Sequence, residues 1–181
     1  SIRFFEPDKP VEREKIQIML EAMRLASCAV QAHWLRAIVV ERDKLPPEKL
    51  NQLKTPVAAL TLDLAPVHIY LFCDLGSVNR IKGSRLKELV DVGALAPTHG
   101  WSHKFVDEFV YPQILEPMTK NLQGYMAAAV ADAGGAAHMA LLAGVDEGLG
   151  VCLNTPNPFL TRQVFGVPED WVPMWVLLVG Y

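Results

Sequence analysis

The longest helical pattern in this chain covers residues Leu122–Glu147, and it is rich in small side chains. Five of the seven residues from Gly134 to Ala140 are Gly or Ala. Small side chains let another helix or a ligand approach the backbone closely. We therefore expect this helix to lie at the centre of the molecule or at an interface between two subunits.

Part of this helix, Tyr125–Val145, is about as long as a bilayer span. However, Asp132 and His138 lie inside it, and its many Gly and Ala residues keep its hydrophobicity below that of a Leu-rich span. The pattern favours a buried helix of a soluble protein, with no membrane partner. The N-terminal residues also lack the basic and apolar regions of a signal peptide.

Charge and cysteine content exclude several classes of protein. The chain has seventeen Lys and Arg and twenty Asp and Glu, which gives a net charge of −3, and both signs are mixed along the sequence. Nucleic acid is therefore not an expected partner. Cys28, Cys73 and Cys152 are widely separated and form no CxxC or Cys/His cluster. They predict neither a disulfide framework nor a metal site, and a reducing cytoplasm is the expected compartment.

The remaining elements predict an α+β fold, because the second and third strands are too far apart for a simple βαβ unit. A helix is expected from Pro10 roughly to Ser27, buried on more than one side because Ile18, Ala22 and Leu25 form a second apolar line. Residues 77–121 are expected to form an irregular or mobile excursion containing a helix over Arg80–Val90. Buried strands are expected at Ala37–Val40, Val67–Cys73 and Met174–Gly180, and a short strand is expected at Val151–Leu153. We expect one domain over residues 1–181, lacking a few residues at one or both ends.

Ser1, Ile2 and Arg3 form the first candidate site. In extended chain the serine hydroxyl and the arginine side chain project to the same side and could bind a terminal phosphate. The alternative is a frayed, solvated terminus.

The second candidate is the segment 26–34, between the first helix and the next strand. Its small residues would let a planar ligand approach the main chain, and Gln31 could donate to and accept from a heteroaromatic edge. An ordinary helix-to-strand turn is the alternative, and Trp34 is expected in the core. The candidate ligand-binding residues are Ser27, Cys28, Ala29 and Gln31.

The third candidate follows Gly148 and Gly150. These glycines do not form a dinucleotide fingerprint, because no strand precedes them and no third glycine follows at the right spacing. The strand exit at Leu153, Asn154 and Thr155 could instead offer main-chain N–H groups to a flavin edge.

Taken together, these segments resemble the FMN-dependent nitroreductase family. The resemblance rests on five motifs in the family's order and spacing, which cover about half of the chain: Ser1-Ile2-Arg3-Phe4, Ala26-Ser27…Trp34, Asp132-Ala133…Leu141-Leu142-Ala143, Gly148-Leu149-Gly150-Val151-Cys152, and Phe165-Gly166-Val167-Pro168…Gly180-Tyr181. It implies a mostly antiparallel central sheet flanked by helices, with the long helix at a homodimer interface. It also implies FMN, reduced by NADH or NADPH and reoxidised by a small aromatic acceptor such as a nitroaromatic or quinone, in a ping-pong cycle without a protein acid or base.

The chain departs from the family pattern at the flavin edge. Aligned on Trp34, the family's Asn, Gln and Pro fall on Val30, Ala32 and His33, so only Gln31, one place out of register, could substitute for the two amides. Two alternative functions therefore stay open: a specialised relative that dehalogenates a substrate or degrades the flavin, and a dimeric protein that binds flavin weakly or not at all.

Four further residues are not among the matched residues of these motifs, and two of them, His99 and Trp101, are candidate substrate-binding residues. His99 and Trp101 lie in the middle region, where a Trp could stack on an aromatic acceptor, although a surface loop with one buried Trp is the alternative. His68 and His138 are expected to be core or interface residues.

Overall fold

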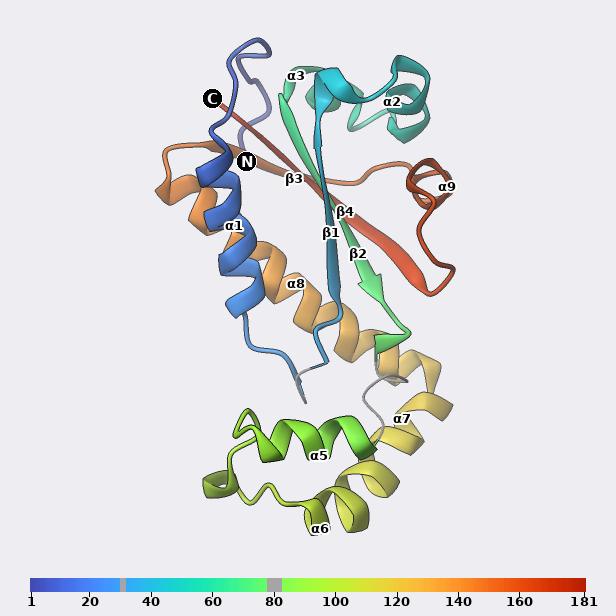
Figure 1. The fold of residues 1–181 in the computed structure, drawn as a ribbon. Coiled ribbons are helices and arrows are strands. Elements are labelled where there is room, and N and C mark those ends of the chain that lie inside the picture. Colours follow the sequence, from blue (N-terminus) through green and yellow to red (C-terminus); the bar gives the residue numbers. More distant parts are fainter. Residues whose placement is uncertain (30–31, 78–82) are drawn as a thin grey trace.

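A four-stranded antiparallel sheet forms the centre of the molecule in a computed structural model that describes residues 1–29, 32–77 and 83–181. The strand order is β1-β2-β4-β3, as seen in Figure 1. The strands are β1 (Leu35–Glu41), β2 (Val67–Asp74), β3 (Gly150–Asn154) and β4 (Trp171–Gly180). The α+β class and all four expected strands are confirmed.

Helices cover both faces of this sheet. Helices α1 (Arg13–Leu25) and α8 (Leu122–Asp146) lie side by side on one face, as Figure 1 shows. The other face is covered by the short helices α2 (Pro47–Leu53), α3 (Ala59–Leu64) and α9 (Thr161–Phe165), and the 3-10 turn η2 (Arg42–Lys44) follows β1. Because side chains alternate along a strand, Ile69 and Leu71 of β2 face α1 and α8, whereas Tyr70 and Phe72 face the opposite layer.

Two expectations for these elements were wrong. Strand β1 lies at an edge of the sheet and is only partly buried, with 41% of Val39 exposed. Helix α1 begins at Arg13 rather than Pro10 and ends at Leu25. Only its face with Ile16, Met19 and Met23 packs on the sheet and α8, so Ile18 and Leu25 of the second apolar line are exposed.

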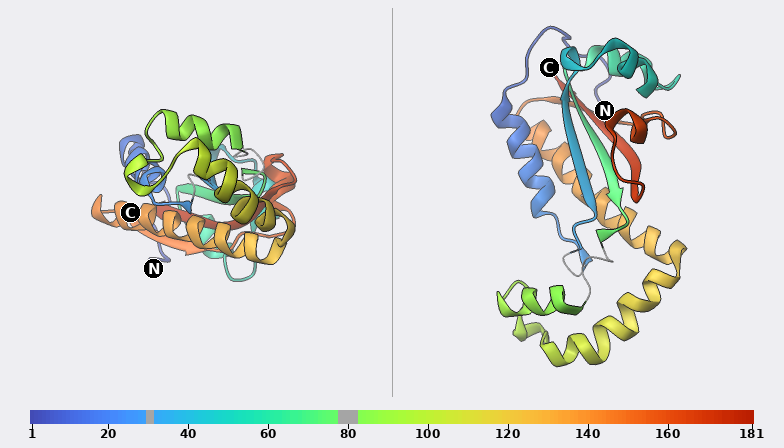
Figure 2. Two further views of the ribbon diagram at one scale, coloured as in Figure 1. Left: turned by 90° about the horizontal axis from the view of Figure 1, so that it is seen from below. Right: turned by 45° about the vertical axis from the view of Figure 1, so that its right-hand side comes forward.

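Residues 83–120 form a separate helical lobe below the end of the sheet, as Figure 1 and the right-hand view of Figure 2 show. The lobe has its own apolar core, which includes Leu86, Val106 and Leu115. The excursion is thus confirmed, but the described part is mostly helical rather than irregular. Its elements are α5 (Gly83–Asp91), η3 (Pro97–His99), α6 (His103–Phe105), the π-helix η4 (Val106–Leu115) and α7 (Glu116–Lys120).

The small residues of α8 allow the close packing that the sequence predicts. A Cβ atom at Gly144 would lie 2.8 Å from Cγ2 of Val151 and 3.0 Å from Sδ of Met19. Residues 123–146 of α8 are apolar and long enough to cross a membrane, with a mean hydropathy of 1.4 and a third of that stretch buried. Ala136, Ala137 and Ala140 belong to the apolar core shared with the sheet and α1, and Ala129 belongs to the apolar core shared with the lobe.

Replacing Gly144 by Ala is expected to destabilise the fold by about 1–3 kcal/mol, because overpacking outweighs the roughly 1 kcal/mol that Ala adds to a helix. Gly134→Ala is the matched control, since its new methyl group would lie at an ordinary 3.5 Å from the Trp175 ring. Urea unfolding of both variants measures the difference. Equal stability of the two would contradict the proposed close packing.

His68 is confirmed as a core residue, because its side chain is fully buried beside Tyr70 and α3. Its Nε2 lies 3.1 Å from the carbonyl oxygen of Ala65 and its Nδ1 lies 3.1 Å from the hydroxyl of Tyr70. Neutral imidazole satisfies both contacts if Nε2 donates and Nδ1 accepts. Burial lowers the pKa of His68 to about 4.

Because the folded pKa lies below the unfolded value of about 6.5, His68 contributes stability that is present above pH 6.5 and lost as pH falls toward 4. The loss is expected to reach about 3 kcal/mol. Urea unfolding between pH 7 and pH 4 should show a smaller loss in His68→Gln than in the wild type. The exposed His138→Gln serves as the control, and an identical pH dependence in all three proteins would refute the assignment.

Candidate functional site

Ala29 and Trp34, in the segment 26–34, are held against α8 by a single carboxylate oxygen. Oδ2 of Asp132 accepts hydrogen bonds from the main-chain N–H of Ala29 at 2.8 Å and from the indole Nε1–H of Trp34 at 2.9 Å. Trp34 is only 1% exposed, and its ring meets that of Tyr125 edge-on with centroids 5.1 Å apart. The expectation that Trp34 belongs to the core is confirmed.

A cavity of about 360 Å³ lies beside this segment, within the usual size range of small-molecule sites. It lies among the end of α1, the segment itself, the start of β1 and the middle of α8, and its wall is mostly apolar. Two of the predicted ligand-binding residues, Ser27 and Cys28, line it. Its other main lining residues are Leu20, Met23, Arg24, Arg36, Asp132 and Ala133.

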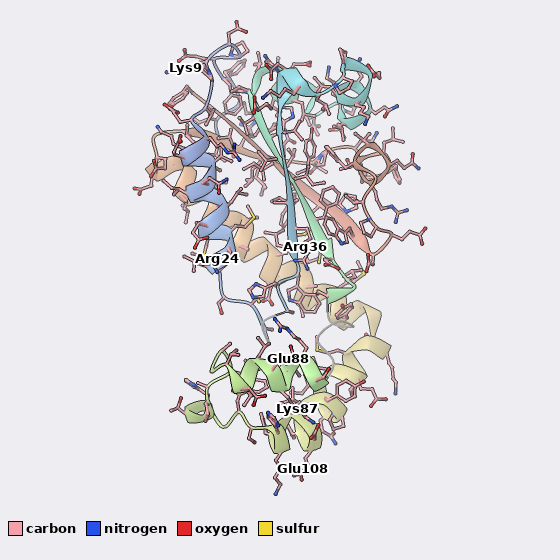
Figure 3. The ribbon with its side chains drawn as sticks, viewed as in Figure 1. Lys9, Arg24, Arg36, Lys87, Glu88 and Glu108 are labelled. Atoms are coloured by element: carbon pink, nitrogen blue, oxygen red, sulfur yellow. The ribbon has the colours of Figure 1, made fainter. Side chains whose placement is uncertain are left out.

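Two arginines place positive charge at this cavity, and Figure 3 shows Arg24 on the end of α1 and Arg36 near the lower end of β1. Arg36 forms an ion pair with the buried carboxylate of Asp74 at 2.7 Å and donates to the carbonyl oxygen of His33 at 2.5 Å. Arg24 pairs with Glu21 on the same helix at 2.5 Å. The Arg36 guanidinium is therefore held in place, whereas the exposed Arg24–Glu21 pair leaves Arg24 more freedom.

Hydrogen bonds within the described part of the segment form a turn, and Cys28 takes part in one of them. The main-chain N–H of His33 donates to Sγ of Cys28 at 3.2 Å, and that of Ala32 donates to the carbonyl oxygen of Ala29 at 3.0 Å. His33 has φ of 48°, a left-handed conformation that the family's proline could not adopt. Burial raises the pKa of the Cys28 thiol, so Cys28 stays a neutral acceptor. Gln31, predicted to contact the ligand, lies outside the described residues.

The predicted phosphate-binding residues lie elsewhere. The main-chain N–H of Ile2 donates to the carbonyl oxygen of Val151 at 3.3 Å, which places the N-terminus along β3. Ser1 and Arg3 on either side are exposed. The terminus is thus anchored at Ile2 rather than frayed, and both polar side chains are accessible.

One chain does not bring its two main candidate segments together. Ala29 contacts α8 at Asp132, whereas the N-terminus lies beside β3, which follows the end of α8 at Asp146. Fourteen residues of helix separate Asp132 from Asp146, or about 20 Å at 1.5 Å per residue. Figure 1 shows the N-terminus near the upper end of α8, whereas the end of α1 and the start of β1 lie toward the lower end of the sheet.

The third candidate segment uses most of its own donors. The main-chain N–H of Thr155 donates to Oδ1 of Asn154 at 2.8 Å, and Nδ2 of Asn154 donates to Oγ1 of Thr61 at 2.9 Å. The N–H of Asn157 donates to the carbonyl oxygen of Leu53. The proposed contact between Leu153–Thr155 and a flavin edge therefore requires this turn to exchange an internal hydrogen bond.

The middle-region candidates lie in the helical lobe. His99 is exposed, and Trp101 is partly buried against the edge of Phe105, with ring centroids 5.6 Å apart. Phe105 stacks in turn on Phe109 at 5.3 Å. An acceptor-stacking role for Trp101 stays a prediction, and its partners show that Trp101 belongs to an aromatic row.

Sequence reasoning missed two residues that shape the cavity. The sequence indicates Asp132 only as a polar residue in the long helix and as part of a family motif, and no motif includes Arg36. A carboxylate inside an otherwise apolar helix was a usable signal, because such a group is buried only with partners. Within the described ranges no three His, Cys, Asp or Glu side chains are grouped to hold a metal ion.

The fold of this chain is that of the nitroreductase family. A nitroreductase family protein from Streptococcus pneumoniae is similar with a TM-score of 0.75 and 20% identity, over 100% of this chain and 85% of that one. A protein from Exiguobacterium sibiricum, solved in complex with FMN, has a TM-score of 0.73 and 19% identity, over 99% and 82%. An enone reductase that catalyses a step of gut-bacterial fatty acid saturation is similar with a TM-score of 0.73 and 19% identity, over 99% of this chain and 83% of that one. No family model and no curated protein matches the sequence.

Proposed function

We propose that this protein is an FMN-dependent oxidoreductase that passes electrons from NAD(P)H to a small aromatic acceptor by a ping-pong mechanism. The observation that carries the proposal is the cavity beside the segment 26–34, the segment that the sequence resemblance assigns to the flavin. The nitroreductase fold supports it, since one similar structure was solved with FMN. Bound FMN would supply the hydride chemistry, and the protein would supply orientation and electrostatics.

The residues at the cavity suit a flavin ring in part. Apolar walls from Leu20, Met23 and Ala133 suit a planar aromatic system, and the Arg36 guanidinium would favour negative charge on a reduced flavin. Ser27 offers a hydroxyl at the cavity edge. Ala32 stands where the family has a glutamine and is only 3% exposed, so it offers no side-chain donor to the ring. We therefore expect FMN to bind with fewer edge hydrogen bonds than in the family pattern.

The complete site requires a second copy of the chain. Arg3 and Ser1 would bind the phosphate from one subunit, and Ser27 with the cavity would receive the ring in the other, because about 20 Å of helix separates these groups within one chain. Exposed apolar side chains on α1 and α8 support a homodimer contact along these helices. They are Ile18, Leu25, Val130, Met139, Leu142 and Val145. Burying such a surface on association is favourable.

Purified protein is expected to take up added FMN and to turn yellow. Anaerobic addition of NADH or NADPH should then bleach the flavin absorbance, and a nitroaromatic or quinone acceptor should restore it. Stopped-flow absorbance at the flavin band measures both half-reactions separately, as a ping-pong cycle requires.

A protein that stays colourless with excess FMN would instead support the alternative that the chain keeps the fold without the cofactor. The buried Ala32 is the observation that favours this alternative. If the protein binds FMN but neither NADH nor NADPH bleaches it, FMN is the cofactor but the proposed reductase cycle is wrong.

Mixed dimers test whether two chains share each site. Arg3→Ala removes a phosphate contact, and Ser27→Trp fills the cavity, so each variant alone is expected to lose most of its bound FMN. Refolding or coexpressing the two together should restore about a quarter of the wild-type sites, since half of the dimers are mixed and each has one intact site. Flavin per chain, measured from the absorbance after gel filtration, reports the result.

Mixing two samples of the same variant gives the control. If the mixed sample binds no more FMN than the separate variants, the sites are not shared. Light scattering on the same column shows whether the protein is a dimer.

A further inference from the structure

The carboxylate of Asp132 occupies an unusual position on α8. Its exposed fraction is intermediate, yet it lies among apolar residues in the middle of a 25-residue helix. A carboxylate costs free energy to desolvate unless charge-assisted hydrogen bonds compensate. Asp132 makes two such bonds through Oδ2, at 2.8 and 2.9 Å, and both partners belong to the segment that borders the cavity.

The segment has few other anchors to the rest of the fold. Its internal bonds, from Ala32 to Ala29 and from His33 to Cys28, shape the turn without attaching it to another element. Arg36, on β1, donates to the carbonyl oxygen of His33, and the main-chain N–H of Asp74, at the end of β2, donates to the carbonyl oxygen of Trp34 at 2.7 Å. Among the described residues, the hydrogen bonds between Asp132 and the segment are thus the ones that tie it to α8.

Tyr125, two turns before Asp132 on α8, connects Trp34 to the end of β2. Its ring packs against Trp34, and its hydroxyl donates to the carbonyl oxygen of Leu75, just after β2. Trp34 also belongs to the apolar cluster that contains the core of the lobe. The indole of Trp34 therefore links α8, the segment 26–34 and the start of the lobe.

We propose that Asp132 is the positioning residue of the candidate site: through the Ala29 amide and the Trp34 indole, it holds residues 26–29 and 32–34 in the conformation that borders the cavity. The inference deepens the proposed function, and its effect on FMN affinity rests on that function. The effect of Asp132 on the conformation of the segment does not depend on the proposed function. Asp132 is expected to contact no reacting atom and to act through the shape of the cavity.

Asp132→Ala is expected to weaken FMN binding roughly ten- to hundredfold, the factor for losing a charge-assisted hydrogen bond. In the absence of FMN, the same variant should show faster hydrogen exchange in a peptide covering residues 26–34 and a shifted Trp34 indole N–H resonance. That resonance is assigned by its disappearance in Trp34→Phe. Fluorescence titration, exchange mass spectrometry and ¹⁵N NMR provide the three measurements.

Three further variants separate positioning from a general loss of stability. Asp132→Asn keeps an oxygen acceptor in place and should restore FMN affinity to within about threefold of wild type. Asp146→Ala, at the exposed end of the same helix, should leave all three measurements unchanged. Trp34→Phe keeps the ring contact with Tyr125, and the double variant Asp132→Ala/Trp34→Phe should lose less than the product of the two separate factors.

Wild-type exchange and indole signals in Asp132→Ala would overturn the inference, as would fully multiplicative effects in the double variant. If Asp132→Ala does not fold, Trp34→Phe decides, because it removes the indole donor to Asp132: faster exchange over residues 26–34 would support the inference, and wild-type exchange would overturn it. A wild-type protein that binds no FMN would refute the proposed function alone, because exchange and the indole resonance still test the role of Asp132.

Discussion

The close packing of α8 against the sheet and α1 is the interaction on which the rest of the structure depends. It exists because Gly144 and the alanines along the buried side of α8 leave room for Val151 and Met19. The stabilisation from dispersion and apolar burial decreases steeply when two packed layers move apart by even the width of a methyl group. The same helix then positions Asp132, so the packing of the core and the shape of the candidate site share one element.

This arrangement places a polar anchor where an apolar helix would otherwise offer none. Asp132 and Tyr125 both reach Trp34, and Trp34 connects the sheet region to the helical lobe. The cavity is consequently bounded by three elements of the fold, α1, β1 and α8, and by one segment that depends on side-chain hydrogen bonds. Such a site keeps its geometry only when the residues that hold its lining side chains in place are themselves correctly positioned.

Sequence patterns predicted most of the fold. The long helix, the α+β class and the four strands were all recognised, because apolar periodicity and glycine or proline boundaries are local properties. The burial of single faces was harder to predict. Ile18 and Leu25 have the spacing of core residues and are exposed in one chain, and β1 reads as a buried strand although it lies at the sheet edge. Periodicity reports which side chains share a face, but not what covers that face.

The sequence by itself determined the residue types at the candidate site: small residues around Ser27, an arginine at position 3, and no amide at positions 30 and 32. Only the tertiary structure decided how they are arranged. It separated Arg3 from Ser27 along α8 and brought Asp132 to Ala29 and Trp34 across about a hundred residues of sequence. The physical reason is that such contacts depend on how helices and strands pack, and local sequence preferences carry no information about packing between distant segments.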